Sequence, residues 1–108
     1  MEKLNFKKEV NFKSGQIYSV CLRGARRYDT SDEFDLSLYT PDFWDQPKAI
    51  ASIVSQNQYL FKWLVAKDCI DNYDSEARTI SGLLNAMMEV YDGFEEREIV
   101  TILRFQIV

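Results

Sequence analysis

The side chains of this sequence that could do chemistry are mainly carboxylates and tyrosines, because the chain contains no histidine. Histidine is the commonest general base and metal ligand, and it activates the nucleophile in Ser-His-Asp and Cys-His sites. The two cysteines, Cys21 and Cys69, lie in apolar contexts without a spacing motif, which argues against a structural zinc site. We expect both to be buried free thiols in a reducing compartment.

Motifs that bind phosphate or calcium are also missing from the sequence. The four glycines, Gly15, Gly24, Gly82 and Gly93, are too far apart to form a Walker A or dinucleotide-binding loop. Residues 71–76 resemble the start of an EF-hand loop but place Tyr, Ser and Glu where two ligands and the invariant glycine belong. We therefore expect no cofactor and no metal site.

Carboxylates gather in two clusters that could raise one another's pKa or bind a divalent cation. The clusters are Asp29, Asp32, Glu33 and Asp35, and Glu95, Glu96 and Glu98. Carboxylates in loops are mostly solvated charges at the ends of strands and helices, which favours that interpretation over catalysis. We expect no catalytic residue and no enzymatic activity, and a carboxylate- or metal-dependent enzyme is the second alternative function.

Two groups of residues fit a protein-binding surface. Large aromatic side chains surrounded by polar ones dominate the energetics of interfaces, and acidic side chains can face a basic partner. The candidate partner-binding residues are Asp42, Phe43, Trp44 and Asp45, together with Glu95, Glu96 and Glu98. The alternative for Phe43 and Trp44 is that they pack inward beneath a helix layer.

Charge is distributed unevenly along the chain, whose formal net charge is -4. Residues 68–98 contain nine acidic and two basic side chains, whereas residues 1–28 contain seven basic and two acidic ones. Arg23, Arg26 and Arg27, next to Tyr28, could contact phosphates and stack on a base. An isoelectric point near 4.8 makes nucleic-acid binding unlikely, because domains that bind nucleic acids are usually basic.

Hydrophobic alternation predicts three strands in the first part of the chain. Residues 4–12 alternate apolar and polar with one interruption at Lys8, and Ser14-Gly15 is a turn signal. A strand over residues 16–24 would complete a hairpin, and residues 34–38 form a third strand after a polar loop.

The later part of the chain mixes helical and strand patterns. Thr40-Pro41-Asp42 is typical of a helix start, and we expect helix to about Gln56. Residues 58–68 fit both periods, with helix preferred over strand. Apolar residues recur at helical spacing over 75–91, ending at Asp92-Gly93, and residues 99–108 predict a strand that is apolar on both faces.

These elements predict one α+β domain over residues 1–108. It would be a two-layer sandwich, in which a three-strand N-terminal meander and the C-terminal strand form an antiparallel sheet with helices packed on one face. The sequence has no apolar run long enough to span a membrane and no secretory signal, so we expect a cytoplasmic protein.

The small size, acidic segments and missing catalytic groups favour a binding protein. We expect an inhibitor, such as an immunity protein, antitoxin or phage-type anti-defence protein, that occludes a basic partner protein. The alternative is an accessory or assembly subunit that acts through homo- or hetero-oligomerisation.

Overall fold

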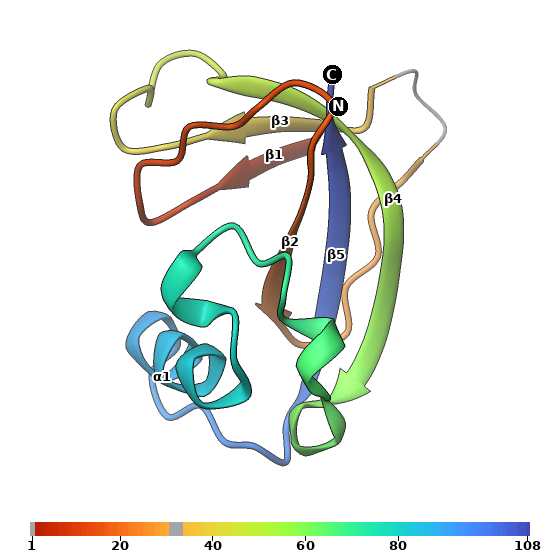
Figure 1. Cartoon of the computed structure of the whole chain (residues 1–108), viewed down its shortest axis with the longest axis vertical. Coiled ribbons are helices and arrows are strands. Elements are labelled where there is room, and N and C mark those ends of the chain that lie inside the picture. Colours follow the sequence, from red (N-terminus) through yellow and green to blue (C-terminus); the bar gives the residue numbers. More distant parts are fainter. Residues whose placement is uncertain (1, 31–33) are drawn as a thin grey trace.

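The computed structural model describes residues 2–30 and 34–108 of the chain. Five strands curl into a mixed half-barrel, and an α-helix covers one end of it (Figure 1). The strands are β1 (Glu2–Asn5), β2 (Ile17–Arg23), β3 (Leu36–Tyr39), β4 (Ala49–Leu60) and β5 (Ile99–Ile107). Their order in the sheet is β1-β3-β4-β5-β2, in which β1 and β3 are parallel and the other neighbours are antiparallel.

The two-layer sandwich predicted from the sequence is therefore wrong. The described residues contain one α-helix, α1 (Ile80–Val90), and three single-turn 3-10 helices: η1 (Phe61–Trp63), η2 (Ala66–Asp68) and η3 (Ser75–Ala77). They cover one end of a curled sheet and do not form a helical layer across its face (Figure 1). None of the helices in the described part of the chain is long and apolar enough to cross a membrane.

The predicted N-terminal hairpin does not form. β1 ends at Asn5 and pairs in parallel with β3, whereas β2 pairs with β5. The alternation over residues 4–12 has another cause, because Phe6 and Phe12 pack into the core from a loop. The two rings lie 5.4 Å apart, and Phe6 also contacts Tyr73 edge-on at 4.6 Å. Burial of aromatic rings thus produces the same sequence pattern as a half-buried strand.

The helix expected to about Gln56 is also wrong, since β4 runs for 12 residues from Ala49 to Leu60. β4 lies between β3 and β5 and hydrogen-bonds to both, so pairing with sequence-distant strands overrides the local helical spacing. Its register with β5 shifts between Ile53 and Ser55, which makes Val54 the extra residue of a β-bulge. The bulge bends the longest strand of the half-barrel.

The segment 58–68 is neither one helix nor one strand. β4 continues to Leu60, and η1 and η2 follow. The carboxylate of Asp68 closes the second turn by accepting a hydrogen bond from the Val65 N–H at 2.8 Å. The helix predicted over 75–91 is confirmed from Ile80 onward, where Thr79 caps α1 by accepting from the Gly82 N–H at 3.1 Å.

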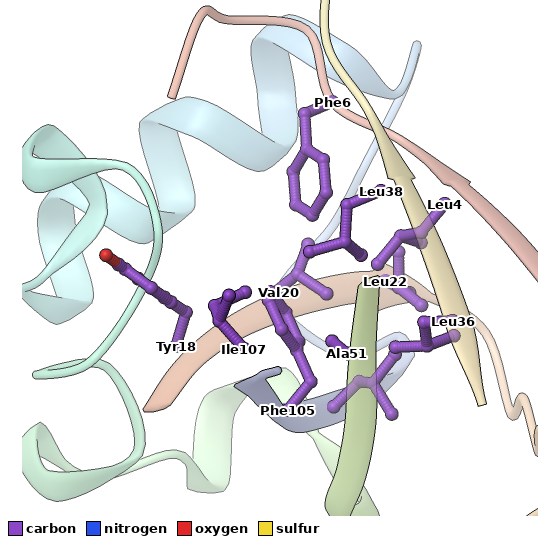
Figure 2. Packing of buried hydrophobic residues seen from close by; sticks show 11 residues of the cluster. Leu4, Phe6, Tyr18, Val20, Leu22, Leu36, Leu38, Ala51, Phe105 and Ile107 are labelled. Atoms are coloured by element: carbon purple, nitrogen blue, oxygen red, sulfur yellow. The ribbon is translucent and has the colours of Figure 1, made fainter. Parts of the chain in front are cut away.

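The core consists of two clusters that meet at β5. Phe105 and Ile107 point into the half-barrel with side chains of β2, β3 and β4 (Figure 2), and Leu103 belongs to the same cluster. Val100 and Ile102 point to the opposite face, against residues of α1, η1 and η3. The expectation that the C-terminal strand is buried on both faces is confirmed, since Arg104, which is half-buried, and Gln106, which is exposed, are the only two of its last six residues that are not buried.

Replacing Gly82 by alanine tests the packing between α1 and η3. A Cβ at this position would lie 2.1 Å from the backbone oxygen of Glu76, so one of the two segments must move. We expect Gly82→Ala to lower the free energy of unfolding by about 1–3 kcal/mol, although alanine is the better helix former by about 1 kcal/mol. Urea denaturation measures the change.

The matched control is Asn85→Ala, at an exposed position of the same helix. Its free energy of unfolding should rise by a few tenths of a kcal/mol, because alanine has the higher helix propensity (roughly 0.5 kcal/mol) and no packing is disturbed. A Gly82→Ala protein as stable as the Asn85→Ala protein would contradict the described contact.

Candidate partner-binding surface

The aromatic candidates Phe43 and Trp44 lie in the connection between β3 and β4, which is a turn and not the start of a helix. The N–H of Phe43 donates to the Thr40 carbonyl at 3.0 Å, and the Thr40 hydroxyl donates to the Asp42 carboxylate at 2.5 Å. With no helix above them, Phe43 is 37% exposed and Trp44 is 80% exposed. Neither ring is part of the buried core, so the inward-packing alternative is wrong for both.

The acidic neighbours of Trp44 differ in how firmly they are held. Asp42 accepts a hydrogen bond from the Lys48 ammonium at 2.8 Å, and this bond, with that from Thr40, lowers the pKa of the carboxyl below its usual range. The same ammonium lies 5.5 Å from the centre of the Phe43 ring. Asp45 is exposed. Lys48 therefore fixes Asp42 and Phe43, while Trp44 and Asp45 extend into solvent.

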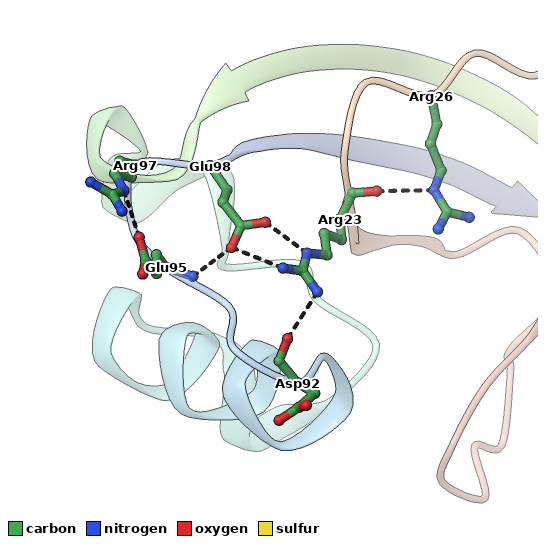
Figure 3. A network of polar contacts seen from close by, with 6 residues as sticks. All are labelled: Arg23, Arg26, Asp92, Glu95, Arg97 and Glu98. Carbon is green, nitrogen blue, oxygen red and sulfur yellow. Dashed lines mark hydrogen bonds and ion pairs between the residues drawn. The ribbon is translucent and has the colours of Figure 1, made fainter.

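Among the acidic candidates at the end of α1, Glu98 is held by an arginine (Figure 3). Its carboxylate accepts from Arg23 Nε at 2.6 Å and from Arg23 Nη2 at 3.2 Å, and it also accepts from the Glu95 N–H at 2.7 Å. Arg23 in turn donates to the backbone carbonyl of Asp92 at 3.0 Å. The Arg23 hydrogen bond lowers the pKa of Glu98, and the arrangement fastens the loop after α1 to the end of β2.

Glu95 and Glu96 are more accessible than Glu98. Glu95 forms a surface ion pair with Arg97 at 2.5 Å, with both side chains more than half exposed. Glu96 is exposed, and its backbone carbonyl accepts from the Lys62 N–H at 2.9 Å. That backbone contact places the acidic loop next to η1.

A shallow hollow lies where these two segments meet. Lys62, Met88, Phe94, Glu95, Glu96 and Arg97 line it. The Lys62 ammonium lies 6.0 Å from the centre of the Trp63 ring, which is 68% exposed, and Met88 is 52% exposed. We call these residues together with Trp63 the Trp63–Glu96 face.

The structure separates the two predicted groups of partner-binding residues. The turn with Asp42, Phe43, Trp44 and Asp45 lies at one end of the molecule, and the loop with Glu95, Glu96 and Glu98 lies at the other (Figure 1). The longest axis of the protein is 34 Å, so the two groups do not form one compact surface.

Five members of the Trp63–Glu96 face were not predicted from the sequence as partner-binding residues: Lys62, Trp63, Met88, Phe94 and Arg97. Met88 fits the apolar stripe of the helix, but it lies at the edge of the stripe and only Leu83 and Met87 of α1 are fully buried. Trp63 lies in the segment 58–68, whose apolar spacing fits both a helix and a strand. Neither spacing indicates that Trp63 lies in a single 3-10 turn that exposes its ring.

The arginine cluster is positioned by the sheet. Arg23 is bonded to Glu98, and Arg26 Nε donates to the Arg23 carbonyl at 3.1 Å (Figure 3). The backbone of this loop is also fixed: the Arg26 N–H donates to the Thr101 hydroxyl at 2.8 Å, and Gln56 bonds both backbone groups of Tyr28 at 2.8 Å. Arg23 and Arg26 thus stabilise the loop, which weakens the phosphate-binding interpretation.

In the first carboxylate cluster, Asp32 and Glu33 lie outside the described residues. Asp35 is buried, and one of its oxygens accepts from the Ile53 N–H at 2.8 Å, next to the β4 bulge. Within residues 2–30 and 34–108, no group of three or more acidic or cysteine side chains could hold a metal ion. Cys21 and Cys69 are buried free thiols, as expected, and burial raises the pKa of Cys21 to about 12.

No protein-family model matches this sequence, and no curated protein matches it either. Among solved structures, the chain is similar to an ASCH domain from Lactobacillus crispatus JV V101, with a TM-score of 0.64 and 10% sequence identity. The match covers 83% of this chain and 63% of the ASCH-domain chain. At this identity the similarity shows the fold alone, and it agrees with the curled mixed sheet in place of a two-layer sandwich.

The ion pair of Glu98 predicts a pH dependence of stability. The folded-state pKa of Glu98 lies below the ordinary value of 4.5. The contribution of its ion pair to the free energy of unfolding is therefore complete above pH 4.5 and is lost as the pH falls through the folded-state pKa. We expect Glu98→Gln to be less stable than the native protein at neutral pH, and the difference to shrink on acidification. Urea denaturation at pH 7, 5, 4 and 3, taken as about the range of carboxylate titration, measures it.

Glu96→Gln is the control, because it removes the same charge from an exposed side chain of the same loop. Its difference from the native protein should stay small at each pH. A Glu98→Gln difference that is constant across the series would mean that the Arg23 pair does not contribute to stability.

Proposed function

We propose that this protein binds a basic partner protein through the Trp63–Glu96 face and inhibits it by occlusion. The observation that carries the proposal is the exposure of Trp63 beside the hollow bordered by Glu95 and Glu96. Tryptophan is enriched among the residues that dominate binding energy, and such residues work best when polar neighbours exclude water around them. A 68% exposed tryptophan on a rigid turn fits that role.

Charge supports a basic partner. Residues 68–98, which form η3, α1 and the loop that follows, contain nine acidic and two basic side chains. Lys8, Arg23, Arg97 and Arg104 neutralise part of this charge. Glu89, Asp92 and Glu96 are exposed and form no ion pair among the described residues. A net negative surface of this kind accelerates association with a positive partner and makes the rate sensitive to salt.

The turn around Trp44 is the competing contact surface. Trp44 is the more exposed of the two tryptophans, and Asp45 is exposed next to it. However, Lys48 already neutralises Asp42 in this turn. The Trp63–Glu96 face combines an apolar anchor, a hollow and the Glu96 carboxylate, which forms no ion pair among the described residues, so we favour it.

The proposal is tested with a tagged protein and its Trp63→Ala, Glu96→Lys and Trp44→Ala variants. A partner captured by the native protein is purified, and its dissociation constant is measured with each variant at low and moderate salt. We expect Trp63→Ala to weaken binding about 30-fold or more, as for a hot-spot residue. Glu96→Lys should weaken it about tenfold at low salt and less at high salt.

Trp44→Ala is the matched control, with the same change at the opposite end of the molecule. Because both tryptophans are exposed, each alanine variant should change the free energy of unfolding by no more than about 0.5 kcal/mol. A change in partner binding is then due to the lost side chain and not to unfolding. Loss of binding in Trp44→Ala alone would move the contact to the β3–β4 turn.

Occlusion requires a further readout, namely the activity of the purified partner. An inhibitor should abolish that activity at a one-to-one ratio, and Trp63→Ala should restore it in proportion to the lost affinity. Binding without any effect on activity would favour an accessory subunit. Self-association in sedimentation that Trp63→Ala removes would assign the same face to a homo-oligomer.

A further inference from the structure

A second candidate site is a cavity of about 230 Å³ between the two open edges of the half-barrel. The strand order leaves β1 at one edge of the sheet and β2 at the other. The cavity is lined by residues 5–7 from the end of β1, residues 20–22 of β2, residues 72–74 and one side of α1. Its lining shares no residue with the Trp63–Glu96 face.

One wall of this cavity is an unpaired stretch of strand edge. The Ser19 N–H donates to the Asp71 carbonyl at 2.8 Å, and the Ser19 carbonyl accepts from Tyr73 at 2.9 Å, so the backbone groups of Ser19 point away from β5. In a strand, the backbone N–H and C=O groups of every second residue point to the same side. The N–H and C=O of Cys21 therefore also point away from β5. Cys21 lines the cavity, and its backbone groups have no hydrogen-bond partner among residues 2–30 and 34–108.

The other walls are mainly apolar and aromatic, with the polar residues Asn5, Lys7, Asn72 and Asp74 among them. Val20, Leu22, Leu83 and Met87 are buried and line the cavity. Three rings, those of Phe6, Tyr73 and Tyr91, contribute to it as well. Burial raises the pKa of Tyr73, so its hydroxyl stays neutral at physiological pH. A flat, apolar ring therefore suits these walls.

Size and charge narrow the ligand class. A cavity of roughly 150 Å³ is enough to bind benzene, whereas drug-sized ligands need about 300–1,000 Å³. The volume here fits one ring with a small substituent. Two charged residues line the cavity: Asp74 is already paired with Lys8 at 3.0 Å, and Lys7 is exposed to solvent, so no buried charge calls for a charged ligand.

We propose that this cavity binds a small, neutral, planar amide, meaning a carboxamide or lactam carried on a single ring. The ring lies among the apolar walls, and the amide pairs its C=O with the N–H of Cys21 and its N–H with the C=O of Cys21. The amide thereby takes the place that a neighbouring strand would have at this edge.

Benzamide is the probe, and methyl benzoate, which keeps the ring and the acceptor but lacks the donor, is its control. Titration of the ¹⁵N-labelled protein, followed by two-dimensional NMR, should shift the amide resonance of Cys21 saturably, with a dissociation constant on the order of 1 mM for a ligand this small. Methyl benzoate should bind about fivefold more weakly, which corresponds to one net hydrogen bond.

Variants of the lining residues test whether the change in the Cys21 amide resonance comes from benzamide bound in the cavity. Ala86→Leu adds volume from α1 and should abolish the saturable shift, whereas Ala66→Leu, at an exposed position outside the lining, should leave it unchanged. Val90→Phe, at a 43% exposed lining position, serves the same purpose if Ala86→Leu fails to fold. The proposal is overturned if Cys21 does not shift, if both probes bind equally, or if benzamide binding survives the filled cavity.

Discussion

The structure depends on the burial of β5 on both of its faces. Alternate residues of this strand enter two separate apolar clusters, and both of its edges are hydrogen-bonded, to β4 on one side and β2 on the other. Of its nine residues, Val100, Leu103 and Phe105 are completely buried, as is the polar Thr101. The half-barrel and the helical end of the molecule are therefore held together through the same nine residues.

The positions of both candidate sites follow from this arrangement. Because β5 and β4 occupy the middle of the sheet, β1 and β2 become its open edges, and the cavity lies between them. The cluster on the other face of β5 holds α1 and η1, and the loop between α1 and β5 then brings Glu96 next to Lys62. The Arg23–Glu98 pair locks the same loop to β2, so the Trp63–Glu96 face rests on rigid elements.

Patterns that reflect local structure predicted their elements correctly. The apolar spacing of α1 and the glycine after it, Gly93 with a φ of 69°, are local signals, and β5 is identified by its continuous apolar run. The sequence predicts helix to about Gln56, because Ile50, Ile53 and Val54 fit a helical spacing. The strand conformation of β4 depends on partners that are distant in the sequence, such as Leu36 for Ala51 and Phe105 for Ile53. Phe6 and Phe12 alternate like a strand but are anchored by ring packing.

The candidate partner-binding residues also differ in whether local sequence or distant contacts determine their environment. The acidic loop at 95–98 is evident from composition, whereas the sequence leaves open whether Trp44 is exposed or packs inward. The sequence does not indicate that Arg23 binds Glu98, because the two residues are 75 positions apart. The pair of Lys48 with Asp42 likewise depends on the turn between β3 and β4. The exposure of Trp63 depends on a single turn whose geometry is set by Glu96 and Glu98 carbonyls that accept from Lys62 and Phe61.

Native-state hydrogen exchange tests the central role of β5 most directly. The amides of Ile102 and Leu103 should exchange only through global unfolding, with a protection free energy equal to that from urea denaturation. The amides of β1, a four-residue edge strand, should exchange through smaller openings. If Ile102 and Leu103 exchanged as fast as Leu4, β5 would not be the element that holds the two clusters together.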